Sequence, residues 1–591
     1  MKKHKIIFAL SLGLVITNLV SCGSGETSQI PEEKLKVEFE HDDGVTQLNY
    51  DNYEDKIVGD NYRFSFKLVD GYTLISITAN GEPVQPIGNN YYIFTLKSGL
   101  NKVKIVTQKL GERTVEKMNV NPLHTMETLY RNGEKPHFPT TGNQKLLVIP
   151  VEIKGHEEFA TKENKDKIEK AFFANSNEID FESVSSYYKK SSYGKLNITG
   201  EVTDWFKLGQ NEAEILAGAD SKYQDLGVYE VVNKALEWVK TSQTSINLDE
   251  YDNNDDGYID GIYLVYGAQN ALSAPTQYSD LLRNHTFYNM KNIGKGTKEN
   301  PVPMTYSWSS VDMVDWSGSN LIDSHTYIHE FGHQLGLTDY YDTKLASSGV
   351  GTATSPMGGL DMMDYNIGDH SMYSKFALGW TAPYKVTGDN GEVEIKIKPS
   401  YSSGDFIIIA GNEYNGLPFD EYIAIEYLKI DDNENNLSYY DATHPFKATA
   451  LQDGRKIPYY KESGIRVTHI DARSVDNDGQ FTDDIHKMAR TKFTNTGQTY
   501  DGYYDPTNFN SYVITTLVSA NLDRNVMGTH FIADNSDLFK EGNSFTFKKG
   551  EINSYSNMLP SLTNKLNDGS LLNFTVNIKS ISEQEATIVI R

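Results

Sequence analysis

One segment, residues 324–342, limits what this chain can be more than any other. It reads SHTYIHEFGHQLGLTDYYD and contains the pattern HExxHxxGxxD. Positions i and i+4 share one face of an α-helix, so His329 and His333 can direct two imidazoles at one metal ion. Gly336 lets the chain leave the helix sharply, and Asp339 can then return as a third ligand. Three protein ligands with one open position are typical of a catalytic zinc site.

Glu330 lies beside these histidines, where a carboxylate can take a proton from a metal-bound water. The alternative is two histidines on a solvated or core helix face. The added Gly and Asp, at the spacing of an extended zinc-binding motif, argue against that alternative. Asp342 competes with Asp339 for the third ligand position, and we prefer Asp339. His325 is one turn earlier, and we expect a neighbour there rather than a ligand.

Several ordered blocks around this motif are similar to one known family. They are KLLVIPVEI (145–153), SVSSYYKKSSYGKLNITGEVTDWF (183–206), GGLDMMDYN (358–366) and SKFALGW (374–380). Over about residues 140–385 the chain resembles the immune inhibitor A family of bacterial secreted metalloproteases, which also has Asp at the third ligand position. The resemblance implies a metzincin-like fold, endopeptidase activity on protein or peptide substrates, and zinc and calcium as metals.

The resemblance also assigns residues after the motif. Met363 matches the methionine that lies beneath the metal in metzincins, and Met362 is the alternative. Tyr365 follows two residues later, where several metzincins carry a tyrosine that stabilises the oxyanion. A packing role for Tyr365 is equally open in a chain with 38 tyrosines.

A second metal site is predicted in YDNNDDGYIDG, residues 251–261. The positions that supply ligands in a calcium loop hold oxygen-bearing groups here, with a glycine at the turn. These candidate calcium ligands are Asp252, Asn254, Asp256, Tyr258 through its carbonyl, and Asp260. Position 12 holds Tyr263 instead of Glu, so the loop is not a full EF-hand, and an acidic solvated turn is the alternative.

The first residues have the pattern of an export signal. Three lysines precede an apolar run that ends in Leu19-Val20-Ser21-Cys22, and this resembles a bacterial lipobox. We therefore predict a lipoprotein signal peptide at 1–21, acylation (for example by palmitate) of the Cys22 thiol, and a flexible linker at 22–34. An ordinary signal peptide or a short transmembrane helix is the alternative. The anchor would hold the protein on the bacterial membrane, facing the extracellular side.

Length and charge bound the remaining possibilities. At 591 residues the chain is too long for one core. Its net charge of −25 argues against nucleic acid as a partner. Cys22 is the single cysteine, so neither an intramolecular disulfide nor a zymogen blocked by a second thiol is available.

The strand and helix patterns divide the rest into three regions. Alternating segments with turn signals predict a small antiparallel β-sandwich at 35–118, acting as a spacer, an adhesive module or a propeptide. Strands and helices alternate over 119–385, and β patterning returns over 386–591. The predicted fold class is multidomain α+β, in which β-sandwich regions flank a zincin- or metzincin-like catalytic domain.

Within the central region, individual elements are predicted from periodicity and capping signals. The expected helices are at 166–173, 183–191, 228–240 and 324–335, and the expected strands are at 145–153 and 261–267.

Two function classes follow from these observations. The first is a zinc endopeptidase that hydrolyses extracellular proteins at the cell surface. The second is a protease-like surface adhesion or binding lipoprotein without catalytic activity. Glu330 favours the enzyme, because a binding domain has no need of a base beside two metal ligands.

Overall fold

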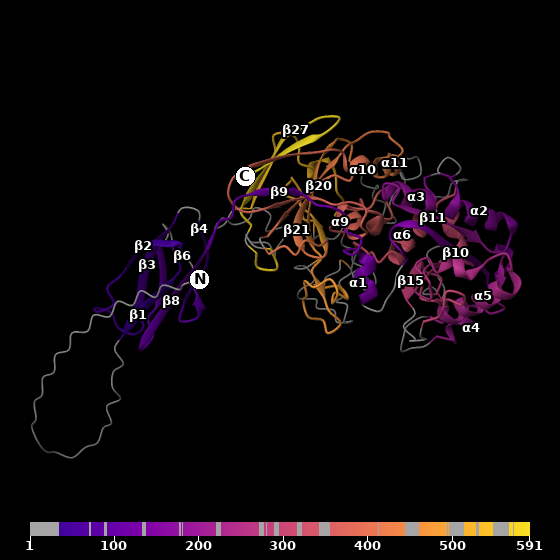
Figure 1. The fold of residues 1–591 in the computed structure, drawn as a ribbon, viewed down its shortest axis with the longest axis horizontal. Helices are drawn as coiled ribbons and strands as arrows, with labels where there is room; N and C mark the ends of the chain where they lie inside the picture. The colour runs from indigo at the N-terminus through magenta and orange to yellow at the C-terminus, as the bar shows by residue number, and fades with distance from the viewer. Residues whose placement is uncertain are drawn as a thin grey trace, which may run out of the picture. The chain divides into compact units, whose positions relative to one another are not determined.

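The structure is a computed structural model in which the chain forms two compact units. One unit holds Met1–Arg113 with Gly388–Gly391, and the other holds Thr114–Thr387 with Glu392–Arg591. Figure 1 shows the ribbon coloured along the chain. The residues that the structure describes are 35–69, 72–84, 86–87, 91–132, 138–175, 179, 181–219, 226–270, 277–278, 281–288, 295–315, 322–341, 355–411, 413–443, 460–492, 495, 513–526, 531–547, 566–570 and 572–591.

The first unit consists of two four-stranded sheets, ordered β1-β8-β4-β5 and β2-β3-β7-β6, around one apolar core. The prediction of a wholly antiparallel sandwich is wrong at one pairing, because β1 runs parallel to β8. The chain crosses to the other sheet between these two strands, and this crossing frees β1 from the hairpin geometry that enforces antiparallel pairing. The strands are β1 (Lys36–His41), β2 (Val45–Tyr50), β3 (Asn61–Leu68), β4 (Tyr72–Ala79), β5 (Glu82–Pro83), β6 (Pro86–Ile87), β7 (Tyr91–Thr95) and β8 (Leu100–Lys109).

The second unit begins with a helix-covered sheet ordered β11-β10-β14-β17-β15. All neighbours in it are parallel except the edge strand β15, which is antiparallel to β17. The strands of this part are β10 (Gly142–Glu152), β11 (Leu196–Val202), β12 (Phe206–Lys207), β13 (Tyr258–Ile259), β14 (Ile262–Gly267), β15 (His285–Tyr288), β16 (Val302–Pro303) and β17 (Thr305–Ser310). Its helices are α1 (Met126–Asn132), α2 (Lys162–Phe173), α3 (Val184–Ser191), α4 (Glu212–Leu216), α5 (Val228–Ser242), α6 (His325–Gln334), α8 (Met362–Tyr365) and α9 (Met372–Ala377), with 3-10 turns η1 (Glu157–Phe159), η3 (Leu248–Tyr251) and η4 (Val311–Asp315).

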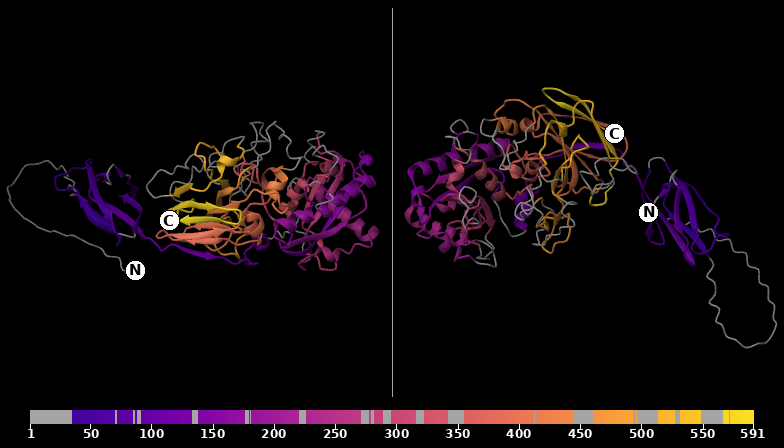
Figure 2. Two further views of the ribbon diagram at one scale, coloured as in Figure 1. Left: turned by 90° about the horizontal axis from the view of Figure 1, so that it is seen from above. Right: turned by 180° about the vertical axis from the view of Figure 1, so that it is seen from behind.

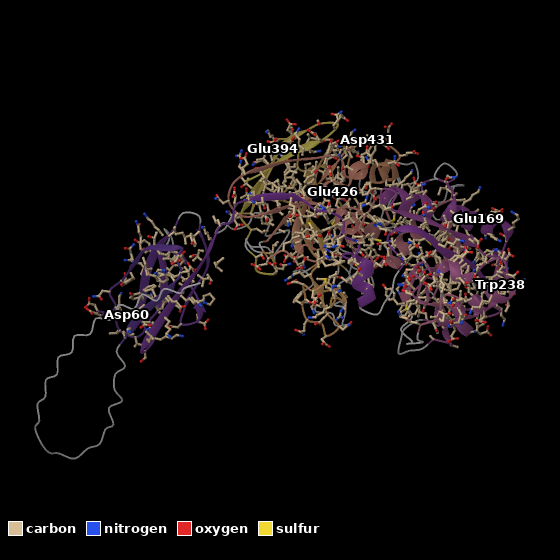
Figure 3. All side chains as sticks on the ribbon, viewed as in Figure 1. Asp60, Glu169, Trp238, Glu394, Glu426 and Asp431 are labelled. Atoms are coloured by element: carbon tan, nitrogen blue, oxygen red, sulfur yellow. The ribbon has the colours of Figure 1, made fainter. Side chains whose placement is uncertain are left out.

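Helices cover both faces of this sheet. Successive residues of a strand point to opposite faces, so Leu146 of β10 packs with α2, α3 and α6, whereas Leu147 packs with α5. Figure 1 shows α2 and α3 on one side of β10 and β11, and α5 on the other. Figure 3 labels Glu169 on α2 and Trp238 on α5, one on each covering layer. Burial on both faces explains why β10 reads as a nearly continuous apolar run.

Two further sheets follow, one ordered β25-β22-β21-β20-β18-β9 and one ordered β19-β28-β27-β26. Figure 2 shows these orange and yellow strands from two more directions. The strands are β9 (Thr114–Lys117), β18 (Tyr384–Thr387), β19 (Val393–Ile397), β20 (Phe406–Ala410), β21 (Glu421–Leu428), β22 (Gly464–Asp471), β25 (Thr515–Leu517), β26 (Ser544–Phe547), β27 (Phe574–Ile581) and β28 (Ala586–Ile590), beside the small pair β23 (Ser474–Val475) and β24 (Arg490–Thr491). The helices here are α10 (Ser400–Ser403), α11 (Leu437–Thr443) and the 3-10 turn η5 (Asn535–Asp537).

The larger of these sheets is buried on both faces. Ile407 and Ile409 of β20 belong to the core shared with the smaller sheet. Phe406 and Ile408, on the opposite face, belong to the same core as the zinc-motif helix α6. The C-terminal region therefore shares a hydrophobic core with the helical region, and both lie in one compact unit.

The coarse fold prediction is confirmed, since the chain is a mixed α/β structure dominated by sheets. The six predicted central elements are present as α2, α3, α5, α6, β10 and β14, with ends shifted by a few residues. The residue bounds predicted for the three regions stay predictions. None of the helices in the described ranges has the length and apolar content needed to span a bilayer. Cys22 and the predicted signal peptide and linker lie outside the described residues.

Candidate metal centre

The helix α6 carries the sequence motif and ends where the sequence predicted. Asp323 accepts a hydrogen bond from the first helical N–H, that of His325, at 3.0 Å. At the other end Gly336 has a φ of +95°, a left-handed conformation that favours glycine. A Cβ at this position would lie 2.5 Å from the ring of Tyr130. Gly336 thus turns the chain sharply enough for Asp339 to face back toward the helix.

The three predicted zinc ligands converge. The Oδ1 atom of Asp339 lies 3.0 Å from Nε2 of His329 and 3.3 Å from Nε2 of His333. The ligand atoms of these three residues all lie within 4.8 Å of one another. Two imidazole nitrogens and one carboxylate oxygen are the donors that zinc prefers in catalytic sites.

The backbone fixes which nitrogen of each histidine faces the cluster. His329 donates through Nδ1 to the carbonyl of Met362 at 2.8 Å, and His333 donates through Nδ1 to the carbonyl of Leu337 at 2.8 Å. A carbonyl can only accept, so the proton of each neutral imidazole resides on Nδ1 and the lone pair on Nε2. Metal-binding histidines commonly donate their other ring N–H to a carbonyl in this way, which orients the ring toward the ion. The residues present therefore fit a metal ion of the zinc type.

The charges of the cluster support one another in the protein alone. Burial would raise the pKa of Asp339, but the neighbouring His333 and His329 hold that pKa well below its usual range. Burial would likewise lower the pKa of His333, but Asp339 and Glu330 raise it to about 9. Opposite charges at contact distance in a buried site account for both shifts.

Glu330 is buried, with 6% of its surface exposed. Its side chain lies beside the edge strand β15, where the Oγ1 atom of Thr286 is 3.1 Å from Glu330 Oε2. No local pattern predicts this neighbour, because Thr286 is 44 positions away and its strand is only four residues long.

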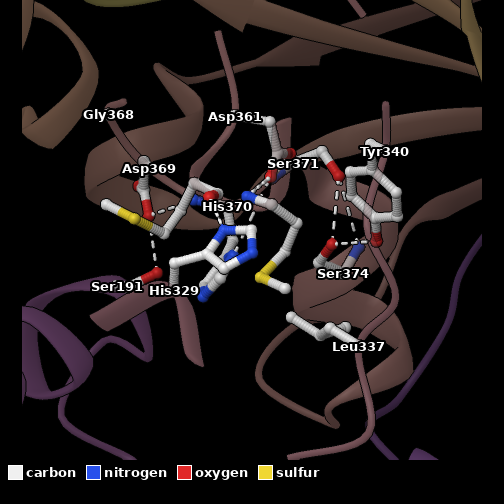
Figure 4. A network of polar contacts seen from close by, with 12 residues as sticks. Ser191, His329, Leu337, Tyr340, Asp361, Gly368, Asp369, His370, Ser371 and Ser374 are labelled. Atoms are coloured by element: carbon white, nitrogen blue, oxygen red, sulfur yellow. Dashed lines mark hydrogen bonds and ion pairs between the residues drawn. The ribbon is translucent and has the colours of Figure 1, made fainter. Parts of the chain in front are cut away.

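The methionine segment lies against the same helix. A Cβ on Gly332 would lie 2.5 Å from Sδ of Met363, so Met363 packs directly on the turn between the two histidines. Asp361 holds this segment by accepting from the backbone N–H of Met363 and of Ser371, each at 2.8 Å. Figure 4 shows this polar network beside His329. The preference for Met363 over Met362 remains an assignment by resemblance, now with the packing that such a role requires.

Two tyrosines are candidates for a role beside the cluster. Tyr365, the predicted catalytic tyrosine, is partly exposed and packs against the core shared by the two C-terminal sheets. Tyr341 has its ring 6.3 Å from that of His329. Burial and the adjacent carboxylates of Asp339, which it hydrogen-bonds, and Glu330 raise the pKa of Tyr341 well above its ordinary value. Its position two residues after Asp339 was the signal available in the sequence. Asp342, the competing ligand, lies outside the described residues.

His325 is placed away from the ligand cluster, as predicted. Its Nδ1 lies 2.7 Å from Oδ1 of Asp323 and its Nε2 lies 3.0 Å from Oδ1 of Asp441 on α11. Asp441 also accepts from the backbone N–H of Gly368 at 2.6 Å. The C-terminal region thus contributes a buried carboxylate that ties the start of α6 to the loop after the methionine segment.

The predicted calcium loop is folded by its own side chains. Asp252 accepts from the backbone N–H groups of Asp256 and Gly257, each at 2.9 Å. Asn254 also accepts from Asp256 N–H, at 3.1 Å, and Asp256 accepts from that of Tyr258, at 3.1 Å. These bonds are typical of a turn in which alternate oxygens point inward.

One carboxylate of this loop has an unsatisfied oxygen. Asp260 is 2% exposed, and its Oδ2 accepts from the N–H of Asn253 at 2.6 Å, while its Oδ1 has no hydrogen-bond partner. Burial and the nearby Asp256 and Asp252 raise the pKa of Asp260 well above its ordinary value. The ammonium of Lys298 approaches the loop, pairing with Asp255 at 2.6 Å. A buried, unpartnered oxygen among like charges fits a hard cation such as calcium.

Comparison with known proteins gives the class. Residues 155–358 match the sequence model described as the immune inhibitor A peptidase M6 catalytic domain. The second unit therefore contains a metallopeptidase domain, and the family resemblance seen in the sequence is confirmed.

Two groups of relatives support this class. A pre-pro-metalloprotease PrtV of Vibrio cholerae serotype O1 is 26% identical over 191 residues, which cover 29% of this chain and 20% of that protein. An immune inhibitor A of Bacillus thuringiensis subsp. alesti is 25% identical over 217 residues, which cover 32% of this chain and 30% of that protein. The matched region thus spans less than a third of either relative, and it supports a protease role for this chain.

Proposed function

We propose that this chain is a zinc endopeptidase that cleaves protein substrates at the bacterial cell surface. The observation that carries the proposal is the convergence of His329 Nε2, His333 Nε2 and Asp339 Oδ1, with Glu330 next to the first histidine. These three residues would hold the ion. When bound, zinc supplies Lewis-acid polarisation of a carbonyl and lowers the pKa of water.

The residues of the chain would do the following. Glu330 accepts the proton of the attacking water and later passes it to the leaving amine. The carbonyls of Met362 and Leu337 hold both imidazoles in the tautomer that faces the metal. Tyr341 lies beside His329 and Asp339 and is a second candidate for the oxyanion role, which the resemblance gives to Tyr365.

Casein zymography with purified protein tests the activity. Wild type should clear casein, a chelator should abolish clearing, and added zinc should restore it, because the ion is required for the reaction. Glu330→Gln should give no clearing while keeping its zinc. Absence of clearing by zinc-loaded wild type on several protein substrates would favour the adhesion lipoprotein instead.

A structural calcium ion is the second part of the proposal. Asp252, Asn254, Asp256 and Asp260, with the carbonyl of Tyr258, would supply its oxygens. The support for it is the unpartnered Oδ1 of Asp260 among neighbouring carboxylates. Isothermal titration of chelated protein with calcium, at saturating zinc, tests this site. If the titration gives no binding heat, or if Asp260→Asn gives the same heat as wild type, the calcium proposal fails.

The surface location rests on the sequence of the first residues. A lipid on Cys22 would anchor the enzyme to the membrane, and residues 22–34 would act as a tether. A clickable fatty acid should label the wild-type protein in cells and leave Cys22→Ser unlabelled. Label on the serine variant would refute the anchor, because the chain has no other thiol.

A further inference from the structure

The hydroxyl of Thr286 joins the proposed general base to a buried chain of polar groups. Its Oγ1 lies 3.1 Å from Oε2 of Glu330, 2.9 Å from the carbonyl oxygen of Glu330 and 2.7 Å from Oγ of Ser307. Ser307 is fully buried on β17, the strand that pairs with β15 through the Thr286–Ser307 register. Gln334, one turn further along α6 and also fully buried, donates to Ser307 Oγ at 2.8 Å.

The direction of these hydrogen bonds follows from the amide of Gln334, at one end of the series. The Nε2 of Gln334 also donates to the carbonyl of Ile262 at 3.0 Å, and a carbonyl can only accept. Both protons of this amide nitrogen are therefore used, and Ser307 Oγ accepts one of them. Ser307 keeps its single proton to donate, and Thr286 Oγ1 is its nearest acceptor, at 2.7 Å compared with 3.4 Å for the carbonyl of Glu330.

Thr286 consequently has one proton left to donate to Glu330. Two acceptors are in range, the main-chain carbonyl and the carboxylate. In an α-helix the carbonyl of residue 330 accepts from the N–H of residue 334. A hydrogen bond to an ionised carboxylate is about twice as strong as one between neutral groups. The two acceptors lie at similar distances from Thr286 Oγ1, 2.9 Å for the carbonyl and 3.1 Å for Oε2, so we assign the proton to the carboxylate.

We infer that Thr286 is a positioning residue for Glu330, and this inference rests on the proposed peptidase function. Its hydroxyl holds one carboxylate oxygen and leaves the other to take the proton of the attacking water. The series of hydrogen bonds from Ile262 through Gln334 and Ser307 to Thr286 runs from the central strand β14 to the edge strand β15. It fixes the rotamer of the base before a substrate binds, which avoids an ordering cost during the reaction.

A merely structural role for Thr286 makes different predictions from a positioning role. Threonine in a short edge strand can serve packing, and loss of packing lowers the melting temperature without a selective effect on the base. A positioning hydroxyl acts selectively on kcat, so its loss lowers kcat while KM and the melting temperature stay near the wild-type values.

The test uses the full mature chain with zinc bound, and compares Thr286→Val, Thr286→Ser and Glu330→Gln with wild type. Valine keeps the shape and removes the donor, so we expect kcat to fall about tenfold with KM within about twofold. Serine should restore kcat to within about twofold of wild type. Zinc content and melting temperature should match wild type in all three variants.

The outcomes separate this inference from the proposed function. If zinc-loaded wild type is no more active than Glu330→Gln, the peptidase proposal fails. If wild type is active but Thr286→Val equals it in kcat, or if serine and valine lose activity alike, the positioning role is wrong. Should the valine variant not fold, Ser307→Ala decides the matter. It removes the donor to Thr286 and should lower kcat by about threefold with KM unchanged, and a kcat equal to that of wild type would overturn the inference.

Discussion

The two metal sites proposed for this molecule are prepared in opposite ways. In the cluster on α6, the carboxylate of Asp339 lies within 3.3 Å of both imidazoles and raises the pKa of His333, which reaches about 9. In the loop at 251–261, carboxylates lie near one another and their oxygens are largely engaged by main-chain N–H groups. One buried oxygen of Asp260 has no partner. The first site is electrostatically satisfied by protein groups alone, and the second is not.

From this difference we infer what each ion does. An ion at the first site replaces contacts that the histidines and Asp339 already make with one another, so it changes chemistry more than folding. An ion at the second site relieves repulsion among like charges and satisfies a buried oxygen, so it changes stability. The role of each site can therefore be tested by removing a carboxylate and measuring activity and melting separately.

The largest expected effect is on activity at the first site. Glu330→Gln keeps the three ligands and removes the proton acceptor, so peptidase activity should fall by about 10²–10⁴-fold or more. Zinc content measured by mass spectrometry of the metal should stay at the wild-type value. Activity equal to wild type would show that another group is the base and that the site is not organised as described.

Asp339→Ala should affect both metal and stability. Removing a ligand should weaken zinc binding by at least about 10–100-fold, which is the loss found when a group that only hydrogen-bonds a ligand is removed. It should also lower the melting temperature of the metal-free protein at pH 7. The stability loss follows because the buried imidazoles lose their partner. Asp342→Ala, the next carboxylate in the sequence, is the matched control. Zinc retention by Asp339→Ala together with zinc loss by Asp342→Ala would transfer the ligand role to Asp342.

The same kind of change at the second site should have the opposite effect on the calcium-free protein. Asp260→Asn removes a buried like charge, so the melting temperature of calcium-free, zinc-saturated protein should rise. Calcium at 100 times its Kd should add about 2.7 kcal/mol to the free energy of unfolding of the wild type. The variant should lose most of this gain and of the accompanying rise in melting temperature. Asp255→Asn is the matched control, because Asp255 pairs with Lys298 on the outside of the loop. If the two variants behave alike, the loop is an acidic turn and the contrast between the sites disappears.

The smallest expected effect is the pH dependence of that calcium response. The folded-state pKa of Asp260 is raised above its unfolded value, so its neutral form stabilises the fold at acidic pH. This contribution is lost as pH rises through the folded-state pKa. Calcium should therefore raise the melting temperature more at pH 7.5 than at pH 5, by a few degrees. A response that is equal at both pH values, measured by scanning calorimetry, would mean that Asp260 does not titrate in the loop.

Local spacing made much of the zinc cluster predictable. The i and i+4 rule places His329 and His333 on one face, and the glycine that ends the helix brings Asp339 back. Tertiary neighbours were not predictable in this way. Thr286 reaches Glu330 from an edge strand, and Asp441 reaches His325 across 116 positions. Such contacts depend on strand order and packing, which a local pattern does not encode.

The strand patterns were similarly informative up to a limit. The run FIIIA of β20 identifies a buried strand, but a continuous apolar run does not reveal which core each face joins. In the structure its alternate residues join two different cores, one shared with the smaller C-terminal sheet and one with α6. The parallel pairing of β1 with β8 was also missed, because strand direction is set by the crossing of the chain and not by the residues in either strand.

Anomalous diffraction at the zinc edge from crystals of the zinc-loaded Glu330→Gln variant, collected beside activity assays of wild type, tests the central claim most directly. We expect one zinc ion, coordinated by His329 Nε2, His333 Nε2 and Asp339 at about 2.0–2.2 Å, in a variant that has lost peptidase activity. Zinc bound by another set of residues, or a variant as active as wild type, would contradict it.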